Sequence, residues 1–244
     1  LDQAAFADRA YQVGSIAELV TVLENLHPGD VSLATGPEIL ATQHLSGLSA
    51  PILTRLWQAA QARHLPLLIE ADGARHKPLK APGNHEPAIP GIADQVIVCA
   101  GLTGLGLPLE ESHVHRAQIF AGLAEVRMGE EITSRSMVRM LIHPAGGLKN
   151  IMPGMRKVLL LNQSDTPALE SQASWIAKKV QSYYDAVLAG ALTQGGILRV
   201  WEPTAAIVLA AGGATRYGKP KQLLEIDNQP MVRRAACLAL AAGL

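Results

Sequence analysis

Short apolar runs alternate with amphipathic segments along most of this chain. The runs at 67–69, 95–100 and 158–161 have the length of buried strands. Capping-box spacings and early prolines mark the segments between such runs as helices. Strands that alternate with helices favour a mainly parallel sheet, so we expect an α/β fold. Further strands are expected at 31–35, 186–189 and 197–201, and helices at 15–26, 51–63, 113–126, 133–142 and 166–184, whereas the first residues look helix-like.

The charge balance excludes several classes of partner. Lys plus Arg and Asp plus Glu number 21 each, so the formal net charge is zero. A nucleic-acid or membrane-surface binder needs a basic excess, and we expect neither partner. Cys99 and Cys237 lack a C-x-x-C partner, which argues against a disulfide framework and fits a cytoplasmic protein.

The stretch 67–90 is the first candidate site. Its expected strand, 67–69, leads directly into Asp72, and an acid at the carboxyl end of such a strand lies where open α/β sheets hold ligands. A proline-stiffened loop rich in cations follows. We interpret the acid as a ligand of a metal or of its water, and the cations as an anion-binding loop; the alternative is a solvated surface loop. The predicted anion-binding residues are Arg75, Lys77, Lys80 and, further along, Arg116, for which a buried ion pair is the alternative.

A second candidate site follows the expected strand 158–161. The residues Asn162-Gln163-Ser164-Asp165 resemble the NKxD element with which P-loop GTPases bind guanine. In that chemistry the carboxylate of Asp165 accepts hydrogen bonds from the base edge while Asn162 braces the loop. Gln163 stands where that element has lysine, so the base is left open. The alternative is that Asp165 caps the following helix.

Several separated motifs together resemble one family. EADGARHKPLKAP with HEPAIP, then HVHRAQIFAGL, HPAGGLKN and VLLLNQSD, are similar to YqeC proteins, described as selenium-dependent hydroxylase accessory proteins. The resemblance implies a P-loop-NTPase-like domain, with Asp72 as a Walker B-like catalytic acid that holds Mg²⁺ through water. The family's first strand and GGKTT loop are missing before Asp72, so we expect no nucleotide hydrolysis by this piece alone. A metal cage of His76, His85, His113, His115 and Glu86 is a further alternative, though their spacing matches no zinc pattern.

A glycine-rich loop near the end of the chain gives the third candidate site. LAAGGATRYGKPKQLL follows an expected strand at 206–210, and its glycines allow backbone N–H groups to approach phosphates. The loop resembles the start of MobA-like nucleotidyltransferases, and among them molybdenum cofactor cytidylyltransferases. That resemblance implies Mg²⁺ and CTP or another NTP, and its expected metal ligands would follow Leu244. The implied nucleotide-binding residues are Gly212, Gly213, Arg216, Gly218 and Lys221.

These features predict two domains and one pathway. We expect a YqeC-like domain at 1–202 and the first strand, loop and helix of a Rossmann-like transferase domain at 203–244, in a fragment cut at both ends. The expected role is molybdenum cofactor maturation for a molybdenum hydroxylase, with transfer of CMP to molybdopterin and a purine nucleotide bound by the YqeC-like part. The alternatives are a non-enzymatic nucleotide-binding scaffold or insertion chaperone, and a transferase acting on a sugar or polyol phosphate.

Overall fold

The computed structural model divides into two compact units. It describes residues 7–27, 29–39, 44–203, 207–210, 218 and 220–241. The first unit comprises residues 1–70 with 90–92, and the second comprises 71–89 with 93–244. The expected domains at 1–202 and 203–244 stay a prediction. In the part of the chain that is described, no helix is long and apolar enough to cross a membrane.

The first unit is a parallel strand pair with two helices. Strand β1 (Arg9–Gln12) pairs with β2 (Ser32–Thr35), and a small hairpin of β3 (Glu38–Ile39) and β4 (His44–Leu45) follows. The first six residues, expected to be helix-like, lie outside the described part of the chain, whereas residues 9–12 form a strand because they pair with residues 32–35. The core of this unit contains Val13, Leu19, Val22 and Ile52.

The helices of this unit begin where their local signals place them. Helix α1 (Ile16–Glu24) is capped by Ser15, whose side chain accepts from the Glu18 N–H while Glu18 reciprocates. Helix α2 (Ala50–Ala62) has a proline in its first turn. Residues 67–69, however, are not in a strand, and Leu68 is 89% exposed. Three apolar residues signal hydrophobicity but supply no pairing partner, so this prediction was wrong.

The second unit is built on a four-stranded, mostly parallel sheet. The strand order is β10-β9-β8-β6, in which β6 (Gln95–Gly101), β8 (Arg156–Asn162) and β9 (Ala186–Ala191) are parallel. Strand β10 (Gly196–Trp201) returns antiparallel beside β9. The three parallel strands therefore end at one shared edge of the sheet.

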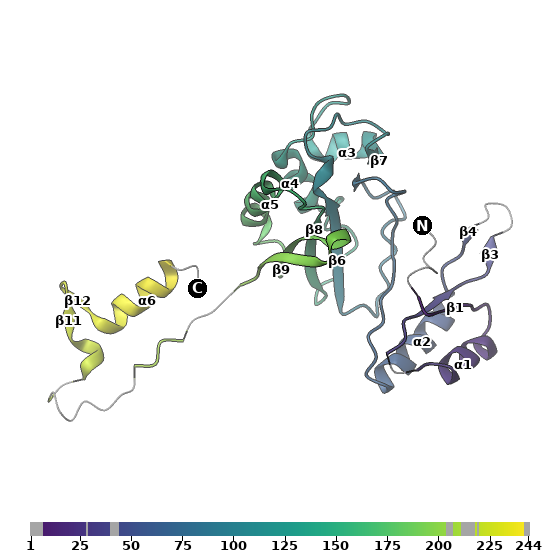
Figure 1. Cartoon of the computed structure of the whole chain (residues 1–244), viewed down its shortest axis with the longest axis horizontal. Coiled ribbons are helices and arrows are strands. Elements are labelled where there is room, and N and C mark those ends of the chain that lie inside the picture. The colour runs from purple at the N-terminus through teal and green to yellow at the C-terminus, as the bar shows by residue number, and fades with distance from the viewer. Residues whose placement is uncertain are drawn as a thin grey trace. The chain divides into compact units, whose positions relative to one another are not determined.

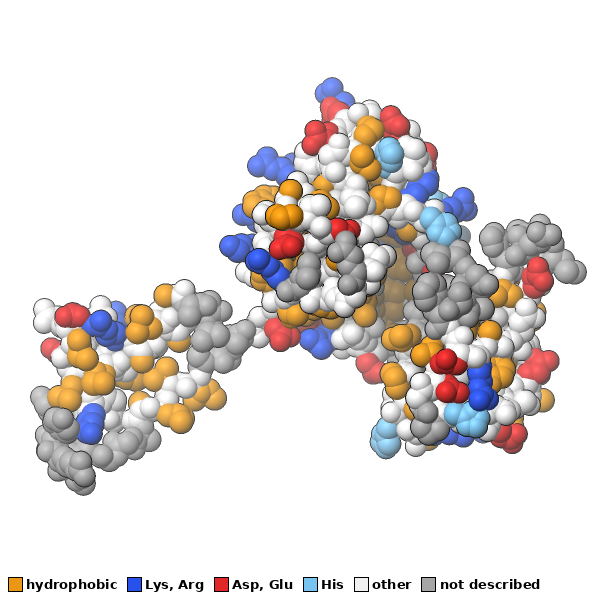
Figure 2. All heavy atoms as spheres, in the orientation of Figure 1, with side chains coloured by type: hydrophobic (Ala, Val, Ile, Leu, Met, Phe, Trp, Pro, Cys, Tyr) orange, Lys and Arg blue, Asp and Glu red, His pale blue; other side chains and the backbone are white. Residues whose placement is uncertain are grey.

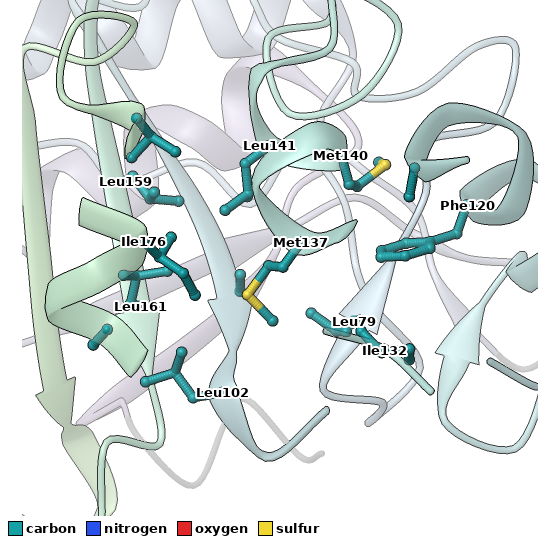
Figure 3. Packing of buried hydrophobic residues seen from close by; sticks show 14 of the residues in the cluster. Leu79, Leu102, Phe120, Ile132, Met137, Met140, Leu141, Leu159, Leu161 and Ile176 are labelled. Carbon is teal, nitrogen blue, oxygen red and sulfur yellow. The ribbon is translucent and has the colours of Figure 1, made fainter. Parts of the chain in front are cut away.

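Three helices of the second unit lie between β6 and β10 in the chain. They are α3 (Ala117–Ala124), α4 (Ser134–Ile142) and α5 (Pro167–Val180), and α4 and α5 lie beside β6, β8 and β9 in Figure 1. Figure 3 shows Met137 and Leu141 of α4 directed toward Leu159 of β8 and Ile176 of α5. The helix expected from 113 begins only at 117, because Val114–His115 form strand β7, which pairs in parallel with β5 (Leu79–Lys80).

The described residues from 220 to 241 form short local elements. They contain a 3₁₀ turn at Lys221–Leu223, the strand pair β11 (Glu225–Ile226) and β12 (Gln229–Pro230), and helix α6 (Met231–Ala241). Residues 207–210 are not in a strand, so the strand expected at 206–210 is not formed over its described part. Leu209 and Leu238 are 91% and 64% exposed. Figure 2 shows hydrophobic side chains on the surface of this region.

Candidate functional site

The carboxyl ends of the three parallel strands bring one group of loops together. Gly101 of β6 is in register with Asn162 of β8, which is in register with Gly190 of β9. The residues that follow these strands therefore lie side by side at one edge of the sheet. This edge is where open α/β sheets hold ligands, so the three loops form the candidate site.

Asn162 braces two of these loops. Its Oδ1 accepts a 2.8 Å hydrogen bond from the Gln163 N–H and a 3.2 Å hydrogen bond from the Leu192 N–H. Leu192 begins the 3₁₀ turn Leu192–Gln194 after β9. One amide oxygen thus joins the loop after β8 to the loop after β9, which is the bracing role expected of Asn162.

Asp165 is exposed at this edge and does not cap the next helix. The cap of α5 is Thr166, whose hydroxyl accepts from the Leu169 N–H at 3.3 Å. The helix-cap interpretation of Asp165 was therefore wrong, because the adjacent threonine takes that position. Ser164, by contrast, is buried, and within the described chain its Oγ has no hydrogen-bond partner. The side chain of Asp165 is exposed to solvent, next to the loops that follow β6 and β9.

Gln163 turns back from this loop onto the end of β6. Its backbone is left-handed, with φ of 63°. Its Oε1 accepts a 2.5 Å hydrogen bond from the Thr103 hydroxyl, in the 3₁₀ turn Leu102–Gly104. A Cβ at Gly101 would lie 2.3 Å from this same oxygen, so the close approach requires glycine there.

The loop that carries Asp72 reaches the same edge. The Gly101 N–H donates a 2.9 Å hydrogen bond to the carbonyl of Pro78. Leu79 and Leu102, one residue beyond each of these, both enter the core of the second unit (Figure 3). The segments that carry Asp72 and Asn162 are therefore brought to the same end of the sheet, not to opposite sides of the molecule.

Asp72 is paired with Lys80. The Lys80 ammonium contacts Asp72 Oδ1, lies 3.1 Å from Glu86 Oε2 and donates to the Gly73 carbonyl at 2.8 Å. Burial raises the pKa of Asp72 above its ordinary value, and the contact with Lys80 opposes that rise. Three oxygens thus surround one cationic side chain at this point.

Arg116 completes this network from the other side. Its guanidinium donates to both oxygens of Glu86, at 2.5 and 2.6 Å, in a bidentate pair. The hydrogen bond from Arg116 lowers the pKa of Glu86 to about 2 and raises the pKa of Arg116. Of the two interpretations for Arg116, the structure therefore shows the ion pair. Lys80 and Arg116 are both paired with carboxylates of this protein, so neither cation is directed at solvent from which an anion would bind.

The other cations of the loop lie around this network. Lys77 donates to the Glu111 carbonyl and lies 3.8 Å from the Glu111 carboxylate. Arg75 has a left-handed backbone with φ of 52°. Burial lowers the pKa of His115, and the nearby charges of Arg116, Arg75 and Lys80 lower it further, so this ring is neutral at pH 7.

The motif HPAGGLKN, 143–150, holds the loop in place. Lys149 Nζ donates to the carbonyls of Gly83 and Asn84, at 2.5 and 3.3 Å. Asn150 Nδ2 donates to the Pro87 carbonyl at 2.9 Å. Sequence reasoning missed this role, and it also missed Gly101 and Thr103. Side-chain hydrogen bonds go mostly to backbone groups or water, but the sequence does not show which backbone Lys149 and Asn150 would meet.

The residues that the structure describes contain no group of three or more His, Cys, Asp and Glu side chains placed to hold a metal ion. The proposed cage of His76, His85, His113, His115 and Glu86 is therefore not formed among them. Glu86 serves the ion network instead.

Part of the third candidate site lies outside the described residues. This applies to Gly212, Gly213 and Arg216. Gly218 has φ of 64°, a left-handed backbone that glycine adopts readily. Lys221 is exposed at the start of its 3₁₀ turn.

Comparison with known protein families agrees with the positions of these motifs. Residues 9–118 match the family model described as YqeC protein. This segment of the chain is similar to YqeC proteins. Within it lie the strands β1 to β4 of the first unit and the Asp72 loop up to Arg116. Residues 206–244 match the model described as MobA-like NTP transferase domain.

One curated relative supports the same assignment. The uncharacterized protein YqeC of Escherichia coli (strain K12) is 38% identical over 97 residues, which cover 40% of this chain. The match spans only 38% of that relative's own length. No solved structure matches this chain.

Proposed function

We propose that the second unit binds a purine nucleotide at the carboxyl edge of β6, β8 and β9. The observation that carries this proposal is the position of Asp165, an exposed carboxylate released from helix capping by Thr166. Asn162 fixes its loop by two hydrogen bonds. A fixed carboxylate accepts hydrogen bonds from the donor groups on a base edge.

The proposal extends to the pathway. We infer a P-loop-NTPase-like domain that works in molybdenum cofactor maturation for a molybdenum hydroxylase, including a selenium-dependent form. The C-terminal segment, by its likeness to MobA-like transferases, would contribute to transfer of CMP from CTP to molybdopterin, with Gly218 and Lys221 at the nucleotide. Mg²⁺ would assist that transfer. The test of this step is the release of pyrophosphate from CTP when molybdopterin is present as the acceptor of CMP.

The oxygen cluster at Asp72 does not fit a bound Mg²⁺ in the present arrangement. The Lys80 ammonium already occupies the point where Asp72 Oδ1, Glu86 Oε2 and the Gly73 carbonyl converge. A divalent cation there would face an adjacent positive charge at contact distance, which is unfavourable. We therefore derive no chemical step through a metal at Asp72.

This same contact favours the second candidate, a scaffold that binds nucleotide without hydrolysing it. Because the carboxylate of Asp72 is paired with Lys80, it stabilises the loop and does not bind a metal ion. The two candidates differ in one measurable quantity, which is the phosphate released from bound nucleotide.

The binding proposal is tested with Asp165→Asn. The amide replaces one acceptor oxygen with a donor, so we expect the affinity for the purine nucleotide to fall by about tenfold or more. Isothermal titration against GTP, ATP, ITP and XTP measures this and identifies the base. The matched control is Glu131→Gln, which neutralises an exposed acid of the same unit.

Two results would contradict the proposal. One is a wild-type chain that binds none of the four nucleotides. The other is an Asp165→Asn variant whose affinities equal those of wild type and of the Glu131→Gln control.

A further inference from the structure

Gln163 stands where the NKxD element has lysine, and its side chain lies against the end of β6. The left-handed backbone at 163, φ 63°, directs it back toward the end of β6. There its Oε1 accepts from the Thr103 hydroxyl and lies against Gly101. A non-glycine residue in this conformation needs compensating contacts, and these are the contacts that the structure supplies.

The contact point is also where the Asp72 loop attaches. A Cβ on Gly101 would meet Gln163 Oε1 at 2.3 Å and the Pro78 carbonyl at 2.9 Å. Gly101 also donates its N–H to that carbonyl. Gly104, in the same turn, is just as close, since a Cβ there would lie 2.6 Å from Leu79 Cδ1. The turn 101–104 is therefore packed between the two loops of the site.

We propose that the Gln163–Thr103 hydrogen bond is a strut that positions the Asp165 loop against the Asp72 loop, so that Gln163 acts on nucleotide affinity without touching the nucleotide. The inference rests on the proposed nucleotide site. Gln163 is then a positioning residue, and Thr103 is its necessary partner. Asn162 ties the loop on its other side, to Leu192.

A double-mutant cycle in the full chain separates a strut from a direct contact. Gln163→Met keeps the length of the side chain and removes the acceptor, and Thr103→Val keeps the shape and removes the donor. For a strut, each variant weakens purine nucleotide binding by about three- to tenfold, the contribution of one hydrogen bond. The double variant is no weaker than either single one, because both changes break the same interaction. Thr103→Ser, which keeps the hydroxyl, retains wild-type affinity.

Different results would overturn the proposal. If Gln163 contacts the nucleotide itself, Thr103→Val leaves the affinity unchanged and only Gln163→Met loses it. If the two losses are additive, the residues act independently. Wild-type affinity in both single variants also contradicts the strut.

A second measurement needs no nucleotide. Amide hydrogen exchange should show loss of protection at the same positions in both single variants, among them Gly101, bonded to Pro78, and Ser164, bonded to Gly190. Different patterns in the two variants would overturn the strut. If the wild-type chain binds no purine nucleotide, the proposed function fails, and the exchange pattern alone still decides whether the strut exists.

Discussion

At the scale of single residues, a carboxylate and its partners determine the state of the Asp72 loop. Glu86 receives two hydrogen bonds from Arg116 and one from Lys80, and its side chain is 31% exposed. A half-buried bidentate pair is stronger than an exposed one, although solvent still screens it. If the Glu86 carboxylate is removed, Arg116 and Lys80 each lose one negatively charged partner.

Glu86→Gln should therefore make stability less dependent on pH. The folded-state pKa of about 2 lies below the ordinary 4.5, so the charged form stabilises the fold above pH 4.5 and this contribution is lost as the pH falls toward 2. At pH 7 we expect the free energy of unfolding to drop by about 1–3 kcal/mol. Urea unfolding of both proteins between pH 7 and pH 3 measures the difference, which should shrink as the pH falls.

The control for this prediction is Glu131→Gln, which removes an exposed acid of the same unit. Its unfolding free energy should follow the wild-type curve. A Glu86→Gln deficit of constant size from pH 7 to pH 3 would contradict the assignment.

At the scale of elements, helix α4 is followed by a tightly packed glycine pair, Gly146-Gly147. The Gly147 N–H donates to the Met140 carbonyl at 2.9 Å, and Tyr184 donates its hydroxyl to the Leu141 carbonyl at 2.7 Å. Burial raises the pKa of Tyr184, so it remains a donor at any ordinary pH. Lys149 and Asn150 follow this glycine pair, so the packing after α4 positions the two side chains that bind the Asp72 loop.

Gly147→Ala should be strongly destabilising. The added Cβ would lie 2.3 Å from the Leu141 carbonyl oxygen and 2.8 Å from the Tyr184 hydroxyl, and the former is backbone that cannot move aside. We expect a loss of about 2 kcal/mol or more in thermal or urea unfolding. Gly122→Ala is the matched control, because its Cβ on α3 meets nothing within 4 Å and should be neutral or stabilising. Equal effects of the two substitutions would refute the packing argument.

Elements marked by local signals could be predicted from the sequence. Ser15 and Glu18 predicted the start of α1, and the apolar run 95–100 predicted β6. Elements that depend on distant partners could not. Residues 9–12 became a strand because 32–35 lie beside them, and 67–69 did not form one. The site followed the same rule. Asn162 was predicted to brace its loop, but the approach of Gln163 to Gly101 joins residues 62 positions apart, and no local pattern encodes it.

At the scale of the whole molecule, the two units differ greatly in the size of their cores. Among the described residues, the core cluster of the first unit has four buried members, whereas the core of the second includes residues from β6, β8, β9 and the helices α3, α4 and α5. Because hydrophobic stabilisation grows with the apolar area buried, the first unit should be the less stable one.

Tryptophan fluorescence can observe the units separately. Trp57 lies in the first unit, and Trp175 and Trp201 lie in the second. In urea, a variant that retains only Trp57 should report a transition at lower concentration than the Trp57→Phe variant does. Coincident transitions would show that the units unfold together.

The bonds made by Lys149 and Asn150 have a consequence for how this protein tolerates change over evolution. Both side chains recognise main-chain carbonyls of residues 83, 84 and 87, not the side chains there. Substitution at Asn84 therefore leaves that recognition intact, whereas no replacement at 84 makes up for a lost ammonium at 149. Among natural variants, we expect substitutions to be more frequent at Asn84, whose carbonyl accepts, than at Lys149 and Asn150, whose side chains donate.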